Sequence, residues 1–379
     1  SRLGTKTKSS PQGSIDSPIR PLSMAIAIAS GVGPERGLFT TIIGGFLVSA
    51  LGGSRFQIGG PAGAFIVLVS ACVLQTGVAG LVLATFLSGL ILVVVALFRL
   101  GSYVRFIPYP VTLGFTAGIA VIIFVSQIKD LLGLTLPHEP GEMVEKLRAL
   151  WQASGSLNGA AVAVAAATIA VIVAIKRAAP ALPNLLIAVT MAALAVTVLH
   201  LPVETISSRF GALPRVPPAP SLPPMSAGLL LQALPWAASF ALLGAIESLL
   251  SAVVADGMSG RRHRPNAELL AQGVANMAAA LFGGICVTGT IARTATNLRA
   301  GSRGPVSGML HALFVLLFML VAAPLAGFIP LAALAGVLAV VAWNMAERTE
   351  IWTVLRSSRA DAVVLLATFL LVVFRDLTA

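Results

Sequence analysis

The sequence predicts an all-α membrane protein, built as an inverted repeat in which two half-helices each follow a short extended stretch. Three observations lead to this prediction. The chain of 379 residues is 57% hydrophobic and only 10% charged. Ten apolar runs have lengths near that of a membrane-spanning helix. Two further segments interrupt this pattern with Gly and Pro or Thr at corresponding places in two halves of the chain.

The composition excludes several classes of protein. Soluble domains carry about 25% charged residues, so a chain with 10% cannot be a soluble enzyme or a disordered scaffold. The net charge of +11 arises from Lys and Arg between apolar runs, which indicates insertion in lipid and not nucleic-acid binding. No nucleophile–base pair, phosphate loop or metal-ligand cluster is present, so we expect no enzyme, cofactor or metal site. Cys72 and Cys286 predict no disulfide framework.

The apolar runs are the candidate spanning helices, since a bilayer crossing takes about 20 mostly apolar residues. They cover residues 37–52, 78–98, 109–127, 157–175, 181–199, 228–255, 266–282, 305–327, 329–345 and 360–374. Two polar stretches separate some of them. The stretch 129–156 contains an amphipathic segment from Glu142 to Trp151, and the Pro-rich stretch 201–227 predicts an extended connection.

The distribution of positive charge predicts the orientation in the cytoplasmic membrane. If the N-terminus is cytoplasmic and the spans alternate, seventeen Lys and Arg residues lie inside and seven outside, with Arg293 within the membrane. This result requires that residues 60–76 and 288–299 each complete one crossing.

Those two segments cannot form continuous helices. The first reads LGGSRFQIGGPAGAFIVLV from Leu51, and the second reads FGGICVTGTIARTATNLRAG from Phe282. Each has a Gly-Gly pair, a short stretch that we expect to be extended (Arg55–Ile58 and Ile285–Val287), and then small residues. Irregular backbone at membrane depth is tolerated only where protein buries it or where it lines a cavity.

The matched positions of the two segments predict a binding site near the middle of the membrane. We expect half-helices to start near Pro61 and near Thr290, with unpaired N–H groups and positive dipole ends directed at the gap between them. Such an arrangement attracts anions. The alternative is a pair of loops or re-entrant turns without a ligand.

Four polar side chains interrupt apolar helices. Glu247 is costly at that depth and is a candidate for proton coupling, or else makes a structural hydrogen bond. Arg293 stays charged, so it faces a polar cavity and its anion or pairs with Glu247. Gln272 and Asn276 lie one turn apart and are expected to join neighbouring helices.

Four motifs together resemble the SulP anion permeases, the family of bacterial sulfate permeases, pendrin and prestin. They are PLSMAIAIASGVGPERGLF (Pro21–Phe39), GGSRFQIGGPAGAF (Gly52–Phe65), LGAIESLLSAVVAD (Leu243–Asp256) and TGTIARTATNLRAG (Thr288–Gly301). The resemblance covers nearly the whole chain from Pro21 onward.

The resemblance implies a seven-plus-seven inverted-repeat transporter fold with a core domain that carries the site and a gate domain. We expect a polar tail at 1–20, a core domain at 21–127 and 228–303, and a gate domain at 128–227 and 304–379. Only about 18 Å of helix is available for the first crossing, and the family's final helix and STAS domain are absent from this sequence.

The resemblance also implies a set of binding residues. The anion would lie between the third-helix start, the tenth-helix start and the first helix, and Glu247 matches the acidic position expected to couple transport to a proton. The substrate-binding residues carried over in this way are Ser23, Ile26, Gly60, Pro61, Ala62, Gly63, Thr290, Ile291, Ala292 and Arg293.

Three positions depart from the family pattern. Leu22 replaces a common Gln, Ala62 replaces an aromatic residue, and Ala292 replaces a Ser. We therefore expect a roomier pocket that binds its anion mainly through backbone N–H groups.

The expected function is secondary active transport of a small anion by alternating access, coupled to H⁺ or Na⁺. Sulfate is the first expected substrate, followed by bicarbonate and dicarboxylates, and the resemblance implies a homodimer. Two alternatives remain: an anion channel of the same fold, and a nucleobase permease. The second would need a polar, aromatic pocket in place of Leu, Ala and Ile.

Overall fold

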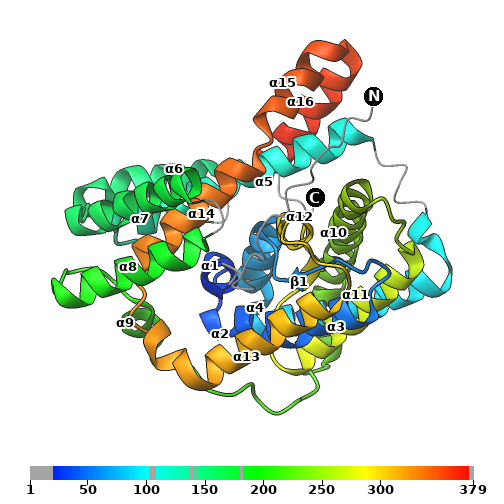
Figure 1. The fold of residues 1–379 in the computed structure, drawn as a ribbon, viewed down its shortest axis with the longest axis horizontal. Helices are drawn as coiled ribbons and strands as arrows, with labels where there is room; N and C mark the ends of the chain where they lie inside the picture. Colours follow the sequence, from blue (N-terminus) through cyan, green and yellow to red (C-terminus); the bar gives the residue numbers. More distant parts are fainter. Residues whose placement is uncertain (1–19, 103–107, 137–139, 141–142, 180–181, 375–379) are drawn as a thin grey trace, which may run out of the picture.

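The computed structural model describes residues 20–102, 108–136, 140, 143–179 and 182–374. The predicted polar tail at 1–20 therefore lies outside the described residues, apart from Arg20. The described chain is largely helical, with two short strands near its centre (Figure 1).

The elements of the first half run from α1 to α9. They are α1 (Arg20–Ala29), α2 (Pro34–Phe39), a π-helix (Thr40–Gly44), α3 (Gly45–Leu51), β1 (Gly59–Gly60), a 3₁₀-helix (Gly63–Phe65), α4 (Ile66–Leu97), α5 (Tyr109–Leu132), α6 (Met143–Gln152), a second 3₁₀-helix (Ala153–Ser156), α7 (Gly159–Ala178), α8 (Asn184–Val198) and α9 (Ile206–Phe210).

The second half continues from α10 to α16. Its elements are α10 (Ala227–Ser259), α11 (Pro265–Leu281), β2 (Thr288–Gly289), α12 (Ile291–Arg299), α13 (Val306–Ala326), α14 (Leu331–Met345), α15 (Arg348–Ser357) and α16 (Arg359–Phe374).

The helices agree closely with the predicted apolar runs. Six helices in the described chain are long and apolar enough to cross a membrane. One of these, α4, is two helices joined at Gly77, whose backbone has φ +68° and ψ −178°. Glycine tolerates this conformation because it has no Cβ. The kink separates the first half-helix from the predicted run 78–98.

The predicted run 37–52 forms one continuous helical segment in three pieces, α2, the π-helix and α3. The π-helix lies against the second broken segment, where a Cβ at Gly44 would be 2.8 Å from Val287 Cγ1. A π-helical turn widens the helix locally and changes which side chains face a neighbour. Here it turns Thr40 and Thr41 into the buried interior.

The two polar stretches have different outcomes. The amphipathic segment is confirmed as α6. The stretch 201–227 is mostly irregular but is not wholly extended, because it contains α9. A capping box explains this helix: Thr205 Oγ1 accepts from Ser208 N–H, and Ser208 Oγ accepts from Thr205 N–H.

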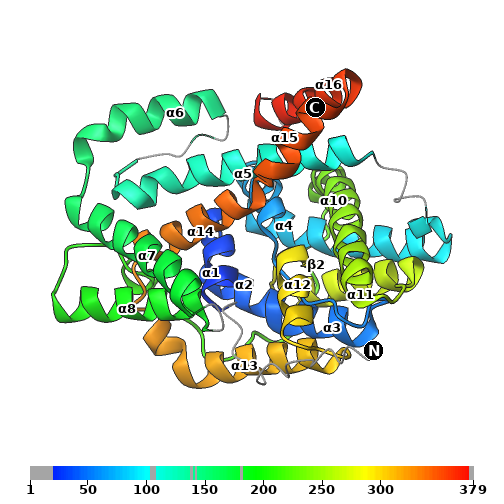
Figure 2. The same cartoon turned by 45° about the horizontal axis from the view of Figure 1, so that its top comes forward.

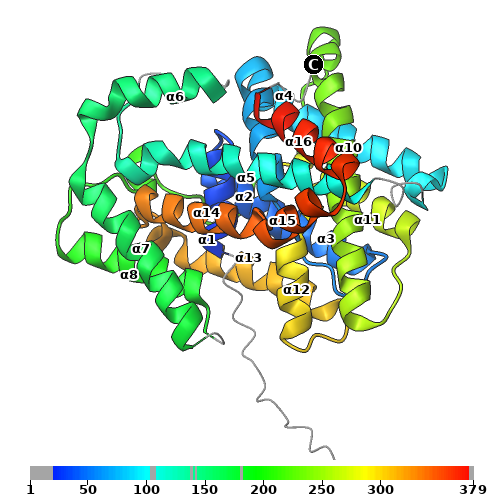
Figure 3. The same ribbon diagram turned by 90° about the horizontal axis from the view of Figure 1, so that it is seen from above.

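The helices pack in two groups, and α1 lies between them in contact with both (Figure 1, Figure 2). The first group contains α2 to α4 and α10 to α12, with α13 packed on α3. The second contains α5, α7, α8, α14 and α16, and Figure 3 shows α5 alongside α14. On this packing we propose that α5 belongs to the gate domain and α13 to the core domain, on the opposite side from the boundaries expected from the sequence.

A close contact between α4 and α11 tests the packing within the first group. A Cβ at Gly89 would lie 2.6 Å from Gly273 O, and a Cβ at Gly273 would lie equally close to Gly89 O. Gly89→Ala should therefore destabilise the protein by about 1–3 kcal/mol because α4 and α11 must separate. The midpoint of heat denaturation in detergent measures this. Gly257→Ala on α10, where no atom lies within 4 Å, should leave the midpoint unchanged or raise it; equal effects of the two changes would contradict this packing.

Candidate functional site

The two broken segments meet in a short antiparallel sheet. Gly59 of β1 is opposite Gly289 of β2, and Gly60 is opposite Thr288. One residue further, Thr290 N–H donates to a backbone carbonyl of the first segment at 3.2 Å. The sheet therefore satisfies backbone groups that would otherwise be unpaired between two interrupted helices.

The strands lie later in the chain than the sequence suggested. We expected the extended stretches at Arg55–Ile58 and Ile285–Val287, but the paired residues are those of β1 and β2, and Arg55 is in a turn. The reason is the close approach of neighbouring backbone. A Cβ at Gly59 would lie 2.7 Å from Val48 Cβ and 3.0 Å from Gly45 Cα, so only Gly fits there.

The two half-helices begin directly after the strands. The 3₁₀-helix at Gly63–Phe65 leads into α4, and Thr290 precedes α12. The residues at the two N-cap positions, Ala62 and Thr290, make no side-chain hydrogen bond to the first turn of their helices. Each helix start therefore keeps unpaired N–H donors and its positive dipole end. This geometry confirms the predicted half-helices.

Arg293 joins the two half-helices. It lies in the first turn of α12 and is 5% exposed, and its Nη2 donates to Pro61 O at 3.1 Å. Its Nη1 is buried and has no hydrogen-bond partner among the described residues. Gly60 makes the room, since a Cβ there would collide with Nη1. A buried cation at a helix N-terminus is unfavourable by itself, which indicates that a negative group completes this site.

Glu247 supplies a negative charge near this cation. It lies on α10, and it interacts electrostatically with Arg293. Its buried Oε2 has no hydrogen-bond partner in the part of the chain that the structure describes. The structural hydrogen bond considered from the sequence is thus not found for this oxygen.

The other predicted site residues differ in their surroundings. Ser23 is fully buried, and its Oγ lies 2.8 Å from Thr41 Oγ1 of the π-helix. The remaining residues fall into three classes: Ile26 and Ala62 are buried, Gly63 and Ile291 are half-buried, and Ala292 is exposed. Their part in binding stays a prediction.

A row of hydrogen bonds between buried polar side chains supports the first broken segment. The sequence analysis did not predict it. Gln57 Nε2 donates to both O and Oγ of Ser248 at 3.0 Å, and its Oε1 accepts from Ser251 Oγ at 3.2 Å. Ser251 Oγ lies 3.2 Å from Thr294 Oγ1, which accepts from Ile58 N–H. The signal in the sequence was the pair of serines that follow Glu247 on α10. These hydrogen bonds fix the backbone before β1 against α10 and α12.

A second carboxylate that the sequence analysis missed lies at the start of α11. Glu268 is fully buried; its Oε2 accepts from Ser54 N–H and its Oε1 accepts from Ser248 Oγ, both at 3.0 Å. Its place in the first turn of a helix, where Glu is common, gave no reason to single it out.

Gln272 and Asn276 support the second segment. Asn276 accepts from Val287 N–H and donates to Val287 O, both at 3.0 Å. Gln272 Nε2 donates to Val287 O at 2.9 Å and to Gly244 O of α10 at 3.4 Å. The second bond joins α11 to α10, as predicted, but the main role of both residues is to hold the loop before β2.

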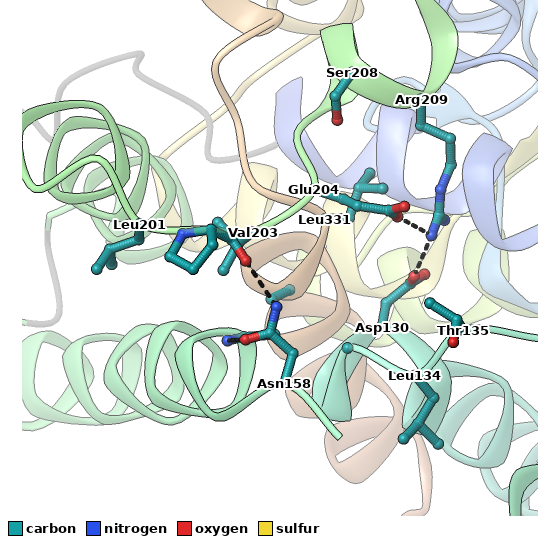
Figure 4. Close-up of a pocket in the computed structure, with 14 residues that line it drawn as sticks. Asp130, Leu134, Thr135, Asn158, Leu201, Val203, Glu204, Ser208, Arg209 and Leu331 are labelled. Carbon is teal, nitrogen blue, oxygen red and sulfur yellow. Dashed lines mark hydrogen bonds and ion pairs between the residues drawn. The ribbon is translucent and has the colours of Figure 1, made fainter. Parts of the chain in front are cut away.

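A cavity of about 370 Å³ lies elsewhere, between the ends of α5, α7, α8 and α14 (Figure 4). Arg209 bonds Asp130 at 3.0 Å and also pairs with Glu204. Burial lowers the pKa of Arg209, but the two carboxylates raise it more, so the pKa is raised overall. Because Arg209 is already paired with two carboxylates, we assign the cavity a structural role. No group of three metal-ligating side chains occurs among the described residues.

Comparison with known proteins now identifies the family. The model of the sulfate permease family matches residues 19–368. This chain belongs to the sulfate permease family. YvdB of Bacillus subtilis, a protein named for sulfate transport, is 45% identical over 359 residues, which are 94% of this chain and 68% of YvdB. The bicarbonate transporter BicA of Synechocystis is 32% identical over 92% of this chain and 62% of its own length.

Solved structures share the fold. The transmembrane domain of a cyanobacterial bicarbonate transporter BicA has a TM-score of 0.85 and 31% identity, covering 93% of this chain and 91% of that one. The murine anion transporter Slc26a9 in its inward-facing state has a TM-score of 0.87 at 19% identity, covering 99% of this chain and 67% of its own. The family member described here is thus a multi-pass membrane protein with the inverted-repeat transporter fold.

Proposed function

We propose that this protein is a secondary active transporter that moves a small anion across the cytoplasmic membrane by alternating access. Sulfate is the first candidate substrate, and bicarbonate or a dicarboxylate is the second. The names of YvdB and BicA support these two inorganic anions. The proposal includes H⁺ or Na⁺ as the coupled ion and, from the family resemblance, a homodimer in the lipid bilayer.

The observation that carries this proposal is the buried guanidinium of Arg293 between two uncapped helix starts. Unpaired backbone donors and a fixed cation both favour negative charge, and they do so more strongly where water is excluded. A neutral ligand would add no counter-charge to the one that Glu247 supplies. The site therefore fits an anion that accepts several hydrogen bonds.

Glu247 offers a mechanism for coupling. The Glu247 carboxylate and the substrate anion are both attracted to the positive charge of Arg293, so the ionised carboxylate weakens binding of the anion. A proton or Na⁺ on Glu247 removes this competition, so binding of the cation raises the affinity for the anion. Linkage makes the effect reciprocal, and bound anion in turn favours the cation.

The two packing groups suggest how access alternates. Both half-helices belong to the group of α4, α10 and α12, whereas α5 and α14 belong to the other group. A rigid-body movement of one group against the other would carry the site between the two membrane faces without breaking the strand pair.

Two alternatives make different demands. An anion channel of the same fold needs a cavity open to both sides at once. A nucleobase permease needs hydrogen-bonding side chains for a neutral ring, but the positions around the half-helices are Ala62, Ile291 and Ala292 and the fixed charge is Arg293. We therefore rank an anion transporter above both.

The test of this function is uptake of labelled anions into proteoliposomes under an imposed pH or Na⁺ gradient. We expect uptake of sulfate or bicarbonate, and faster uptake when the vesicles are preloaded with the same anion. Uptake without stimulation by preloading would indicate a channel. Uptake of labelled uracil without uptake of any anion would reject the proposal.

Arg293 should be required for anion binding. Arg293→Gln removes the charge and should weaken anion binding by about 2–5 kcal/mol, which abolishes uptake at ordinary concentrations. Arg293→Lys should be intermediate, because one ammonium cannot bond Pro61 O and cradle an anion with the same geometry. The control is Arg299→Gln, an exposed residue of the same helix. Normal uptake by correctly inserted Arg293→Gln protein would remove Arg293 from the site.

Glu247→Gln should uncouple transport from the driving ion. In the unchanged protein, acidification or added Na⁺ should raise the apparent anion affinity, because the competing carboxylate is neutralised. The amide is neutral at every pH, so the affinity of the variant should be high and nearly independent of pH and Na⁺. Initial uptake rates between pH 5 and pH 9 measure how the apparent anion affinity depends on pH. The exposed Glu145→Gln on α6 is the control. A pH profile that Glu247→Gln leaves unchanged would refute the coupling role.

A further inference from the structure

We propose that Arg36 and Glu268 are positioning residues that hold the two strand-bearing loops, each from a helix of the opposite repeat. Arg36 on α2 binds the loop before β2, and Glu268 on α11 binds the loop before β1. Neither residue contacts Arg293 through a hydrogen bond or ion pair in the described structure. The part of the test that measures transport rests on the proposed function.

Arg36 holds the second loop at its first residue. Its Nη1 donates to Gly283 O at 2.6 Å, where Gly283 has φ +69°. Arg36 also interacts electrostatically with its neighbour Glu35 on the short helix α2. One turn later, Thr40 Oγ1 accepts from Ile285 N–H at 2.7 Å. The loop is thus fixed at two points by α2 and the π-helix.

Glu268 holds the first loop in the same way, with the opposite charge. Its carboxylate accepts from Ser54 N–H, directly after the Gly-Gly pair, and from Ser248 Oγ. Arg264 N–H donates to Gly53 O at 3.2 Å, and a Cβ at Gly53 would collide with the backbone at Arg264. The loop therefore lies directly on the start of α11.

The two arrangements correspond in the two repeats. Both α2 and α11 begin with Pro, and both loops begin with Gly-Gly. In one loop the group that is held is a carbonyl, which selects Arg; in the other it is an N–H, which selects Glu. With the orientation expected from positive charge, Arg36 is at the external face and Glu268 at the cytoplasmic face.

Each clamp is linked to the site. From Glu268, hydrogen bonds run through Ser248, Gln57 and Ser251 to Thr294 in the first turn of α12. From Arg36, the link is the loop backbone, along residues 284–287 to β2 and the N-cap of α12. Loss of a clamp should therefore move the N–H donors at the half-helix starts without removing any of them.

The test combines hydrogen exchange with transport kinetics. Arg36→Met should speed amide exchange roughly tenfold at residues 283–287, before β2, and leave residues 52–58, before β1, unchanged. Glu268→Ala should speed exchange at 52–58 and leave 283–287 unchanged, since each change removes one charge-assisted hydrogen bond to its own loop. In uptake assays both changes should raise KM for the anion several-fold at nearly constant kcat. Arg36→Lys and Glu268→Gln should restore both the exchange rates and KM. Lys still donates to Gly283 O, and Gln can still form hydrogen bonds with Ser54 N–H and Ser248 Oγ.

The controls and contrary outcomes separate this inference from the proposed function. Exposed Arg55→Met and Glu145→Ala should change neither readout. The proposed roles of Arg36 and Glu268 would be wrong if exchange became equally faster in both loops, or if KM stayed unchanged in active protein. Neither result would contradict anion transport. If the unchanged protein takes up no anion, the proposed transport function is wrong. The exchange pattern would still test whether Arg36 and Glu268 hold their loops. If Glu268→Ala does not fold, Arg36→Met and Arg36→Lys decide alone.

Discussion

Backbone N–H and C=O groups cost several kcal/mol each when they are unpaired in the apolar part of a membrane, and this chain breaks two helices there. The pairing of β1 with β2 resolves most of that cost, because each broken segment satisfies the other. The pairing needs Gly59, Gly60 and Gly289, since side chains at these places would meet Val48, Arg293 and Gln57. The rest of the first packing group serves to bring these two segments together.

The same geometry leaves a small set of groups unsatisfied at the centre. The starts of α4 and α12 have no side-chain caps, and one nitrogen of Arg293 and one oxygen of Glu247 have no hydrogen-bond partner within the described chain. Elsewhere around the strands, buried polar side chains such as Gln57 and Asn276 are bonded to backbone. Gln272 Oε1, beside the loop before β2, is also without a partner among the described residues. The unpaired groups of Arg293 and Glu247, of opposite charge and beside two uncapped helix starts, support the proposed binding site.

Each half of the protein therefore depends on the other to hold its broken segment. The loop before β1 is held by α10, α11 and α12 of the second repeat, and the loop before β2 is held by α2 and the π-helix of the first. Neither half could bury its broken segment alone. This mutual support also means that both half-helices would move as one unit if the first packing group moves against the second.

The sequence by itself determined the membrane class, most helix positions and the two half-helices, and it singled out Arg293 and Glu247 as candidate site residues. These features follow from local composition, because charge and Gly-Pro breaks are rare and costly inside apolar runs. Only the tertiary structure decided the strand register, the placing of α5 with α14, the short helix α9, and the roles of Glu268 and Arg36. The strand register and the contacts of Glu268 and Arg36 join residues more than 200 positions apart in the chain. No local pattern specifies which distant carbonyl or N–H a side chain will meet.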